Sequence, residues 1–572
     1  MIYQILIGGE AGYGIMTSGL LLSKLAAHAG KHVFDYVEYP SLVRGGHNAY
    51  SIAISEGEVR SLKSTIDLLV CFNQETFQRH KHQLVQSAIV MYDPDEFKID
   101  GPYQKVEVPF RTILKKGGGS FTMKNTVLLG SLLALLEGNI EWLYEYLQKQ
   151  FEKKGTNVVE FNKYFVKEGY DYITNNYKAV IRPVIGHIAG QQKQMVLTGN
   201  DAFCVGALLA DCRFYAAYPM TPSSTVLATM ASWQKKTQIV VRHSEDEIAV
   251  VNSALGASFA GVRSAVGTSG GGFSLMVEGV SLAGITETPI VMFLSQRPGP
   301  ATGMPTWTEQ GDLLFAVNAG HGEFPKIVLA PGDVEEMIEL TAKAFNLADI
   351  YQTPVIVMSD MLLSESHKSM LVSRCDEIAA SYVVNRGALV SQPSHHPYHR
   401  YAISESGISE RLVPATKGSF YQANSYEHEE DSHTTEHASA RRAQVEKRAR
   451  KTVTYFRDHF VSPRVYGDLE AADTVVVCWG STKGAVLEAM KILADNGHQI
   501  ACIHFNHVYP LEPGHITHFF PFGKNYILIE NNSHAQFGKL LRQETGIEID
   551  KQLLKYDGRP IGPEEIVEFI AN

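Results

Sequence analysis

Four short tracts in the middle of the chain hold hydroxyl, carboxylate, glycine and guanidinium groups that could bind and activate a small anion. They read "YPMTPSSTV" (218–226), "RHSEDEIAVV" (242–251), "GTSGGGFSL" (267–275) and "SQRPGPATGMPTWTEQGD" (295–312). Arg297 could clamp a carboxylate through two parallel charge-assisted hydrogen bonds, and the glycine tract would let a ligand approach backbone donors closely. Taken together, the tracts predict a binding site; taken singly, each also fits an ordinary surface loop.

The first two tracts predict more specific features. Thr221 is expected to be the N-cap of a helix and Pro222 its first residue, which leaves the amides of Ser223 and Ser224 free to hold a carboxylate. A helix that is merely well capped is the alternative. In the second tract the adjacent acids 245–247 would push at least one carboxyl toward protonation if they are desolvated.

Alternating strands, glycine loops and helices predict an α/β protein with three domains and mainly parallel sheets. Each of the four tracts follows an apolar strand signal. Ligands gather outside the carboxyl ends of the strands in open parallel sheets, so we expect the tracts to meet at one edge. The domains are expected at 1–190, 195–370 and 463–572, with an irregular connector and an exposed helix at 371–462.

Several tracts resemble one enzyme family. "YPMTPSS", "SEDEIAVVNSALGASFAG", "TSGGGFSLM" and "QRPGPATGMPT" look like the thiamine-pyrimidine-binding domain of 2-oxoacid:ferredoxin oxidoreductase alpha subunits. "IGGEAGYGIMTSG" with "YVEYPSLVRGGHNAYSIAIS" resembles the gamma domain of the same enzymes, here fused ahead of alpha, and the last domain resembles their transketolase-C-like domain. The resemblance covers nearly the whole chain, with the motifs in the family's order.

The resemblance implies roles for the matching residues. Glu245 falls where the family has its thiamine-activating glutamate, which hydrogen-bonds to the aminopyrimidine ring. Thr221 falls on the threonine that contacts the 2-oxoacid, and Arg297 on the arginine that pairs with a substrate carboxylate. Met220 replaces the usual isoleucine, a swap that conserves volume. We further expect substrate selection at Thr302 and Thr306 and cofactor contacts at Thr268, Ser269 and Gly270.

The resemblance also implies cofactors and partners. Thiamine diphosphate is expected to be shared with a beta subunit, coenzyme A to be a co-substrate and ferredoxin the electron acceptor. The six cysteines are scattered with no C-x-x-C, and no convincing Gly-Asp-Gly motif for magnesium-diphosphate is present. We therefore expect Mg²⁺ and a [4Fe-4S] cluster on the beta subunit of an (alpha-beta)2 heterotetramer, and assign no metal ligand here. Arg44, Gly45 and Gly46 could face the coenzyme A pyrophosphate; a structural turn is the alternative.

The favoured substrate is 2-oxoglutarate, oxidised to succinyl-CoA and CO2 or formed by the reverse carboxylation. Pyruvate or a broad range of 2-oxoacids is the alternative, and the direction of flux is left open. A nicotinamide dehydrogenase is a second alternative, because Gly12, Gly14 and Thr17 precede Asp35 at close to Rossmann spacing, although threonine is a poor third member of that motif. A third alternative is a non-catalytic assembly subunit.

Composition excludes other classes. A net charge of -10 and a pI near 6.1 argue against nucleic acid as the main partner. We read the basic tract "ARRAQVEKRARK" (440–451) as a solvated helix face, and His428, His433 and His437 as solvated side chains rather than metal ligands. No apolar run reaches the ~18 residues that span a bilayer, and the start lacks a secretory signal, so a cytoplasmic protein is expected.

Overall fold

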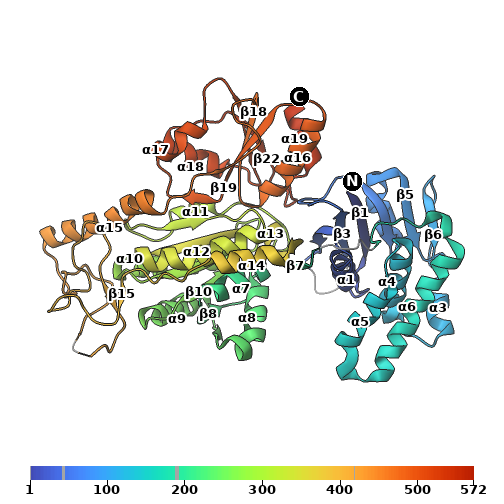
Figure 1. Ribbon diagram of the computed structural model, residues 1–572, viewed down its shortest axis with the longest axis horizontal. Coiled ribbons are helices and arrows are strands. Elements are labelled where there is room, and N and C mark those ends of the chain that lie inside the picture. Colours follow the sequence, from blue (N-terminus) through green and yellow to red (C-terminus); the bar gives the residue numbers. More distant parts are fainter. Residues whose placement is uncertain (1, 42–45, 187–191, 418, 572) are drawn as a thin grey trace. The chain divides into compact units, whose positions relative to one another are not determined.

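In the computed structural model, which describes residues 2–41, 46–186, 192–417 and 419–571, the chain divides into two units (Figure 1). The first unit comprises 1–197, 366–375 and 562–572, and the second comprises 198–365 and 376–561. No described helix is long and apolar enough to cross a membrane. The expected α/β class is confirmed.

The first unit is built on an eight-stranded mixed sheet in the order β6-β5-β4-β1-β3-β2-β14-β7. The pairs from β6 to β1 are parallel, as the alternating pattern predicts, whereas β3 pairs antiparallel with both β1 and β2. Its strands are β1 (Tyr3–Glu10), β2 (His32–Glu38), β3 (His47–Ser55), β4 (Ile66–Cys71), β5 (Leu84–Tyr92), β6 (Gln104–Glu107), β7 (Gln194–Thr198) and β14 (His367–Leu371). Its helices are α1 (Ile15–His28), α2 (Gln74–His80), α3 (Phe110–Lys116), α4 (Lys124–Leu135), α5 (Ile140–Phe151), α6 (Thr156–Asn176) and α19 (Pro563–Ala571).

Asp35 of β2 has a structural role in this unit. It is fully buried and accepts hydrogen bonds from Ser23 Oγ (2.8 Å), Tyr50 Oη (2.7 Å) and the backbone N–H of His367 (2.9 Å), with His367 Nδ1 a further 3.0 Å contact. A carboxylate satisfied in this way is not free to bind a ribose hydroxyl. The nicotinamide alternative therefore loses the acid on which it depended.

The second unit contains a seven-stranded sheet in the order β20-β12-β13-β11-β10-β8-β9, parallel except for β20. Its central strands are continuous apolar runs buried on both faces, as is typical of parallel sheets covered by helices. The strands are β8 (Phe214–Ala217), β9 (Val240–His243), β10 (Ser264–Thr268), β11 (Ile290–Gln296), β12 (Ile327–Leu329), β13 (Pro354–Asp360) and β20 (His507–Tyr509). Its main helices are α7 (Gly199–Leu209), α8 (Ser224–Thr237), α9 (Glu247–Phe259), α10 (Gly270–Thr286), α11 (Leu313–Val317) and α12 (Val334–Tyr351).

A five-stranded sheet, in the order β17-β19-β18-β21-β22, belongs to the same unit. The next strand after β19 in the chain, β20, belongs to the seven-stranded sheet, where it pairs antiparallel with β12. One buried apolar cluster spans both sheets. The elements are β17 (Arg464–Tyr466), β18 (Thr474–Trp479), β19 (Ile500–Phe505), β21 (Asn525–Glu530), β22 (Lys551–Leu554), α16 (Lys483–Asp495) and α18 (Gln536–Thr545).

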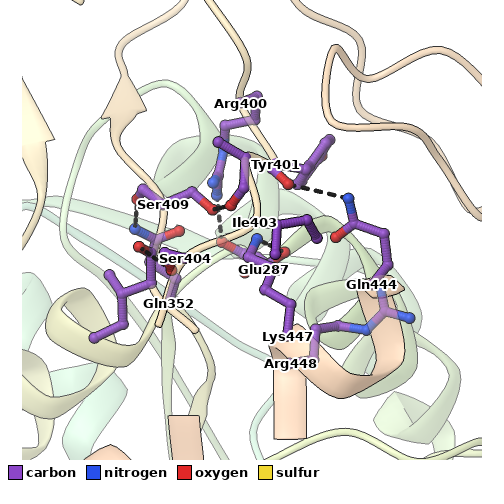
Figure 2. A network of polar contacts seen from close by, with 12 residues as sticks. Glu287, Gln352, Arg400, Tyr401, Ile403, Ser404, Ser409, Gln444, Lys447 and Arg448 are labelled. Atoms are coloured by element: carbon purple, nitrogen blue, oxygen red, sulfur yellow. Dashed lines mark hydrogen bonds and ion pairs between the residues drawn. The ribbon is translucent and has the colours of Figure 1, made fainter. Parts of the chain in front are cut away.

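A buried ionic cluster around Glu287 holds the connector against the end of α10 within the second unit (Figure 2). Glu287, which follows α10, accepts from Lys447 Nζ (2.6 Å), and Lys451 Nζ lies 2.6 Å from its other oxygen. Arg400 donates to the Glu287 carbonyl (2.8 Å). Both lysines lie on α15 (Ala438–Asp458) and are buried, so the prediction of a solvated basic helix face is wrong on this side of the helix.

The histidine predicted to be solvated at position 428 is buried as well. Its ring stacks on Tyr401 with centroids 3.6 Å apart, and its Nε2 lies 3.2 Å from the Ile285 carbonyl oxygen. The physical reason is the same: the connector folds back onto the end of α10 and encloses these side chains. His433 and His437 are exposed, as expected.

Candidate active site

Four neighbouring parallel strands, in the order β11-β10-β8-β9, end at one edge of the seven-stranded sheet, and one of the four tracts follows each of them. Their side chains touch there. Arg297 reaches Thr221, and the sulfur of Met220 lies 3.3 Å from the Gly272 nitrogen. The expectation that the tracts share one edge is confirmed.

Thr221 lies in a turn and does not cap the following helix. The Ser223 N–H donates to the Met220 carbonyl (2.9 Å), which closes the turn, so α8 begins only at Ser224. Ser223 occupies the N-cap position and its side chain makes no capping bond. The predicted cap is therefore wrong by two residues, and the Thr221 carbonyl instead accepts a 2.7 Å hydrogen bond from Arg297 Nη1.

The buried acid of the second tract is Glu247, not Glu245. Glu245 and Asp246 are exposed, and Asp246 caps α9 by accepting from the Ala249 N–H (2.7 Å). Glu247 is only 3% exposed, and within the described residues its Oε1 has no hydrogen-bond partner. An unpaired buried carboxylate oxygen is costly, so it points to a ligand that supplies the missing donor.

The glycine tract gives Glu247 the room to reach this edge. A Cβ on Gly272 would lie 2.5 Å from Glu247 Oε1 and 2.2 Å from Thr268 Oγ1, so only glycine fits there. Thr268 and Ser269 are buried, and the Ser269 hydroxyl is a second buried polar atom for which the described residues provide no partner. Gly270 starts α10, where its backbone packs against the Asp312 carboxyl.

Arg297 is the cation of this edge. It is half-buried, and burial lowers its pKa while the charge of Asp312 opposes that shift. Of the two threonines expected to select substrate, Thr306 is buried and Thr302 is exposed. Their roles stay predictions.

Two acids of the same loop were missed from the sequence. Burial raises the pKa of Asp312 to about 6, against the opposing charge of Arg297, and burial with the charge of Asp312 raises the pKa of Glu309 to about 7. The two acids stand in "TEQGD" (308–312), at the end of the loop segment that begins with Arg297. From the sequence alone this tract indicates no role, because isolated loop acids are usually solvated.

The residues expected to bind coenzyme A belong to the first unit. Arg44 and Gly45 lie outside the described residues, and Gly46 is exposed with φ 80°, a conformation that suits glycine. The coenzyme A contact therefore stays a prediction.

Two protein-family descriptions match the chain. "Pyruvate ferredoxin/flavodoxin oxidoreductase" matches residues 4–172, and "Pyruvate flavodoxin/ferredoxin oxidoreductase, thiamine diP-bdg" matches residues 205–447. The second match contains all four tracts.

Individual proteins match over nearly the full length. The 2-oxoacid:ferredoxin oxidoreductase 2 alpha subunit of Aeropyrum pernix is 32% identical over 98% of this chain and 96% of its own length, and that of a Sulfolobus species is 31% identical over 99% and 96%. A solved structure titled 2-oxoglutarate:ferredoxin oxidoreductase from Magnetococcus marinus, with 2-oxoglutarate, coenzyme A and succinyl-CoA bound, is 31% identical. It superposes with a TM-score of 0.92 over 100% of this chain and 99% of that one.

Proposed function

The chain belongs to the 2-oxoacid:ferredoxin oxidoreductase family, and from that membership we propose that it is the alpha subunit of a 2-oxoglutarate-specific enzyme. With a beta subunit it would convert 2-oxoglutarate, coenzyme A and oxidised ferredoxin to succinyl-CoA, CO2 and reduced ferredoxin, or run the reverse carboxylation. The observation that carries this proposal is the sheet edge that the tracts of Arg297 and of the buried Glu247 share, where Glu247 Oε1 has no hydrogen-bond partner among the described residues. The full-length match to a 2-oxoglutarate enzyme favours that substrate, whereas the family descriptions keep pyruvate as the alternative.

The residues at this edge fit thiamine diphosphate. When bound, this cofactor supplies the electron sink for decarboxylation of a 2-oxoacid. We propose that Glu247, rather than Glu245, accepts the hydrogen bond from the pyrimidine ring, because its Oε1 is buried and the part of the chain that the structure describes offers it no donor. The backbone of Gly272 leaves the space for this approach, and the buried Ser269 hydroxyl, for which no described residue is a partner, offers a further polar contact.

The substrate carboxylate would pair with Arg297. Its Nη1 already donates to the Thr221 carbonyl, so the guanidinium is held in place and loses little side-chain entropy when the substrate binds. Thr221 thus acts through its backbone as a positioning residue, and contact of its hydroxyl with substrate stays part of the proposal.

We propose that Mg²⁺ and the [4Fe-4S] cluster lie on the beta subunit, in an (alpha-beta)2 assembly that reduces ferredoxin. Support comes from the cysteines: five of the six are buried, and the sulfurs of Cys478 and Cys502 lie 3.6 Å apart. A four-thiolate cluster needs more thiolates than this pair provides. The cytoplasmic location stays a prediction.

The test is an assay of the chain co-expressed with its beta partner. We expect ferredoxin reduction that depends on coenzyme A and thiamine diphosphate, and a higher kcat/KM for 2-oxoglutarate than for pyruvate. Preference for pyruvate would overturn the substrate assignment. Full activity of the complex after replacement of both Glu247 and Arg297 would favour the non-catalytic assembly subunit.

Replacing Arg297 with lysine should raise KM for 2-oxoglutarate about 10–100-fold, because loss of a charge-assisted pair is worth about 1.5–3 kcal/mol. We expect a smaller effect on kcat, since the contact already exists before the transition state. Arg213→Lys, at an exposed arginine paired with Asp211, is the matched control. Steady-state kinetics that show a fall in kcat at constant KM would contradict this role.

Replacing Gly272 with alanine should weaken thiamine diphosphate binding about 5–100-fold, because overpacking costs about 1–3 kcal/mol and the new Cβ would push Glu247 and Thr268 apart. The apparent cofactor affinity of the complex measures this. Gly256→Ala is the control, since a Cβ there meets nothing within 4 Å. Equal cofactor affinity in both variants would show that Glu247 does not need this close approach.

A further inference from the structure

Glu309 and Asp312 are two acids at the candidate site that the proposed chemistry does not use. The Asp312 carboxyl packs on the first residue of α10, where a Cβ on Gly270 would lie 2.4 Å from Oδ2. Glu309 packs back onto the same loop, where a Cβ on Gly311 would lie 2.9 Å from Oε1. Both acids lie on the segment that connects Arg297 to α11.

The position of this segment is fixed from two sides. The Asp312 N–H donates to Gln296 Oε1 (3.0 Å), and Gln296 in turn donates to the Ser359 carbonyl (3.0 Å) at the ends of β11 and β13. Gln536 of α18 donates to the Gly311 carbonyl (2.6 Å) and accepts from the Leu314 N–H (3.0 Å). The two carboxyls are thus held at the edge by backbone that both sheets support.

The charges at this edge are unbalanced. The charge of Asp312 acts on both Arg297 and Glu309, and Asp312 and Glu247 approach the start of the same helix at Gly270 and Gly272. Three carboxyls thus gather near Arg297, while Glu245 and Asp246 are exposed outside them. A second cation, Arg559, stacks on Trp307 of the same loop with its guanidinium carbon 3.3 Å from the ring centre. An incoming carboxylate adds another negative charge, which raises the proton affinity of the nearby acids.

We propose, on the basis of the function proposed above, that Asp312 and Glu309 take up a proton from solvent when the 2-oxoacid carboxylate pairs with Arg297. The proton neutralises one acid, so Arg297 exchanges Asp312 for the substrate as its counter-charge. The proton returns to solvent when the 2-oxoacid leaves. The pair acts as a set of positioning residues that tune the charge of the substrate site and does not touch the reacting carbon.

The raised pKa values of the two acids set the pH range. With Asp312 at about 6 and Glu309 at about 7, both become ionised as the pH rises toward 8. Uptake of one proton on binding then weakens affinity by up to about tenfold per pH unit above this range. The KM for 2-oxoglutarate should therefore rise with pH, and kcat should change less.

The experiment uses the alpha-beta complex with 2-oxoglutarate between pH 5.5 and 8.5. For the wild type we expect log KM to rise with a slope approaching one above about pH 7. Asp312→Asn and Glu309→Gln should each flatten the slope and lower KM at pH 8 about 3–10-fold, because a repelling charge is removed. Glu323→Gln, at an exposed acid of the following loop, should leave the profile unchanged.

Calorimetry of 2-oxoglutarate binding in two buffers of different ionisation enthalpy gives an independent readout, with uptake of up to one proton expected at pH 7.5. Binding without proton uptake, a pH-independent KM, or a raised KM in Asp312→Asn would overturn this inference and leave the enzyme assignment intact. A wild-type complex that neither binds nor turns over any 2-oxoacid would overturn the proposed function and this inference with it.

Discussion

Replacement of Glu247 by glutamine is expected to lower kcat of the complex about 100–10,000-fold, the range typical of a lost proton-handling group. Glu247 is buried, its Oε1 has no donor among the described residues, and it lies where only glycine fits at position 272. Glutamine keeps the size of the side chain and removes its charge and one of its acceptor oxygens. The fold and the assembly should therefore persist while thiamine-dependent turnover is lost.

Glu245→Gln is the matched control, two residues away on the same tract and exposed. We expect its turnover to stay within about twofold of the wild type, because a surface substitution seldom shifts free energies by more than ~0.5 kcal/mol. Ferredoxin-linked turnover, together with gel filtration of the complex, measures both variants. The reverse result, with Glu245→Gln inactive and Glu247→Gln active, would return the role to the residue first suggested by the motif.

The helical period of α9 contains the information that separates the two glutamates. Its buried positions are Glu247, Val250, Val251, Ala254, Leu255 and Ser258, which repeat at three- and four-residue intervals. Glu247 is in phase with this apolar stripe, whereas Glu245 precedes the helix and Asp246 caps it. The motif alone places the functional glutamate to within two residues, and the helical period of the buried positions selects Glu247 over Glu245.

The strands and the shared edge could be predicted because apolar runs between glycine loops are strong local signals. The two-residue error at "MTPSS" had a different origin: Thr-Pro is a good cap sequence, yet the turn closed by Ser223 and Met220 competes for the same residues. Which of two local hydrogen-bond patterns forms depends on tertiary contacts, here the bond from Arg297 to the Thr221 carbonyl. Sequence spacing does not record such a contact.

The connector was the hardest segment to predict, because its burial is ionic. Charged residues normally indicate a solvated face, and in α15 the lysines at 447 and 451 are one turn apart on the side that faces Glu287. Their partner lies 160 residues earlier in the chain, counted from Lys447. No local pattern connects the two. The same holds for Asp349, which pairs with Arg263, Arg386 and Arg411.

Replacement of Glu287 by glutamine should destabilise the second unit by about 3–5 kcal/mol, because it removes the anion that two buried lysines share. Burial by itself would raise the pKa of Glu287, but Lys447, Lys451 and Arg400 outweigh burial and hold that pKa well below its usual range. Because the folded pKa lies below the unfolded one, this stabilisation is present above about pH 4.3 and is lost as the pH falls further. The difference in free energy of unfolding between the wild type and Glu287→Gln should therefore be largest at pH 7 and should shrink as the pH falls below about 4.3.

Denaturant unfolding and the rate of proteolysis within 371–462 measure this effect, since a loosened α15 would expose the connector. Glu446→Gln, an exposed acid on the same helix, is the control and should change stability by less than ~0.5 kcal/mol. Adding Lys447→Met and Lys451→Met to the Glu287→Gln variant should recover much of the loss, because apolar side chains need no counter-charge in a buried site. If the triple variant were no more stable than the single one, the lysines would stabilise the connector through their other contacts, such as the 3.2 Å bond from Lys451 to the Gln352 carbonyl. Equal stability of Glu287→Gln and Glu446→Gln would show that the hydrogen bonds of Arg400 and Gln444 suffice to hold the connector in place.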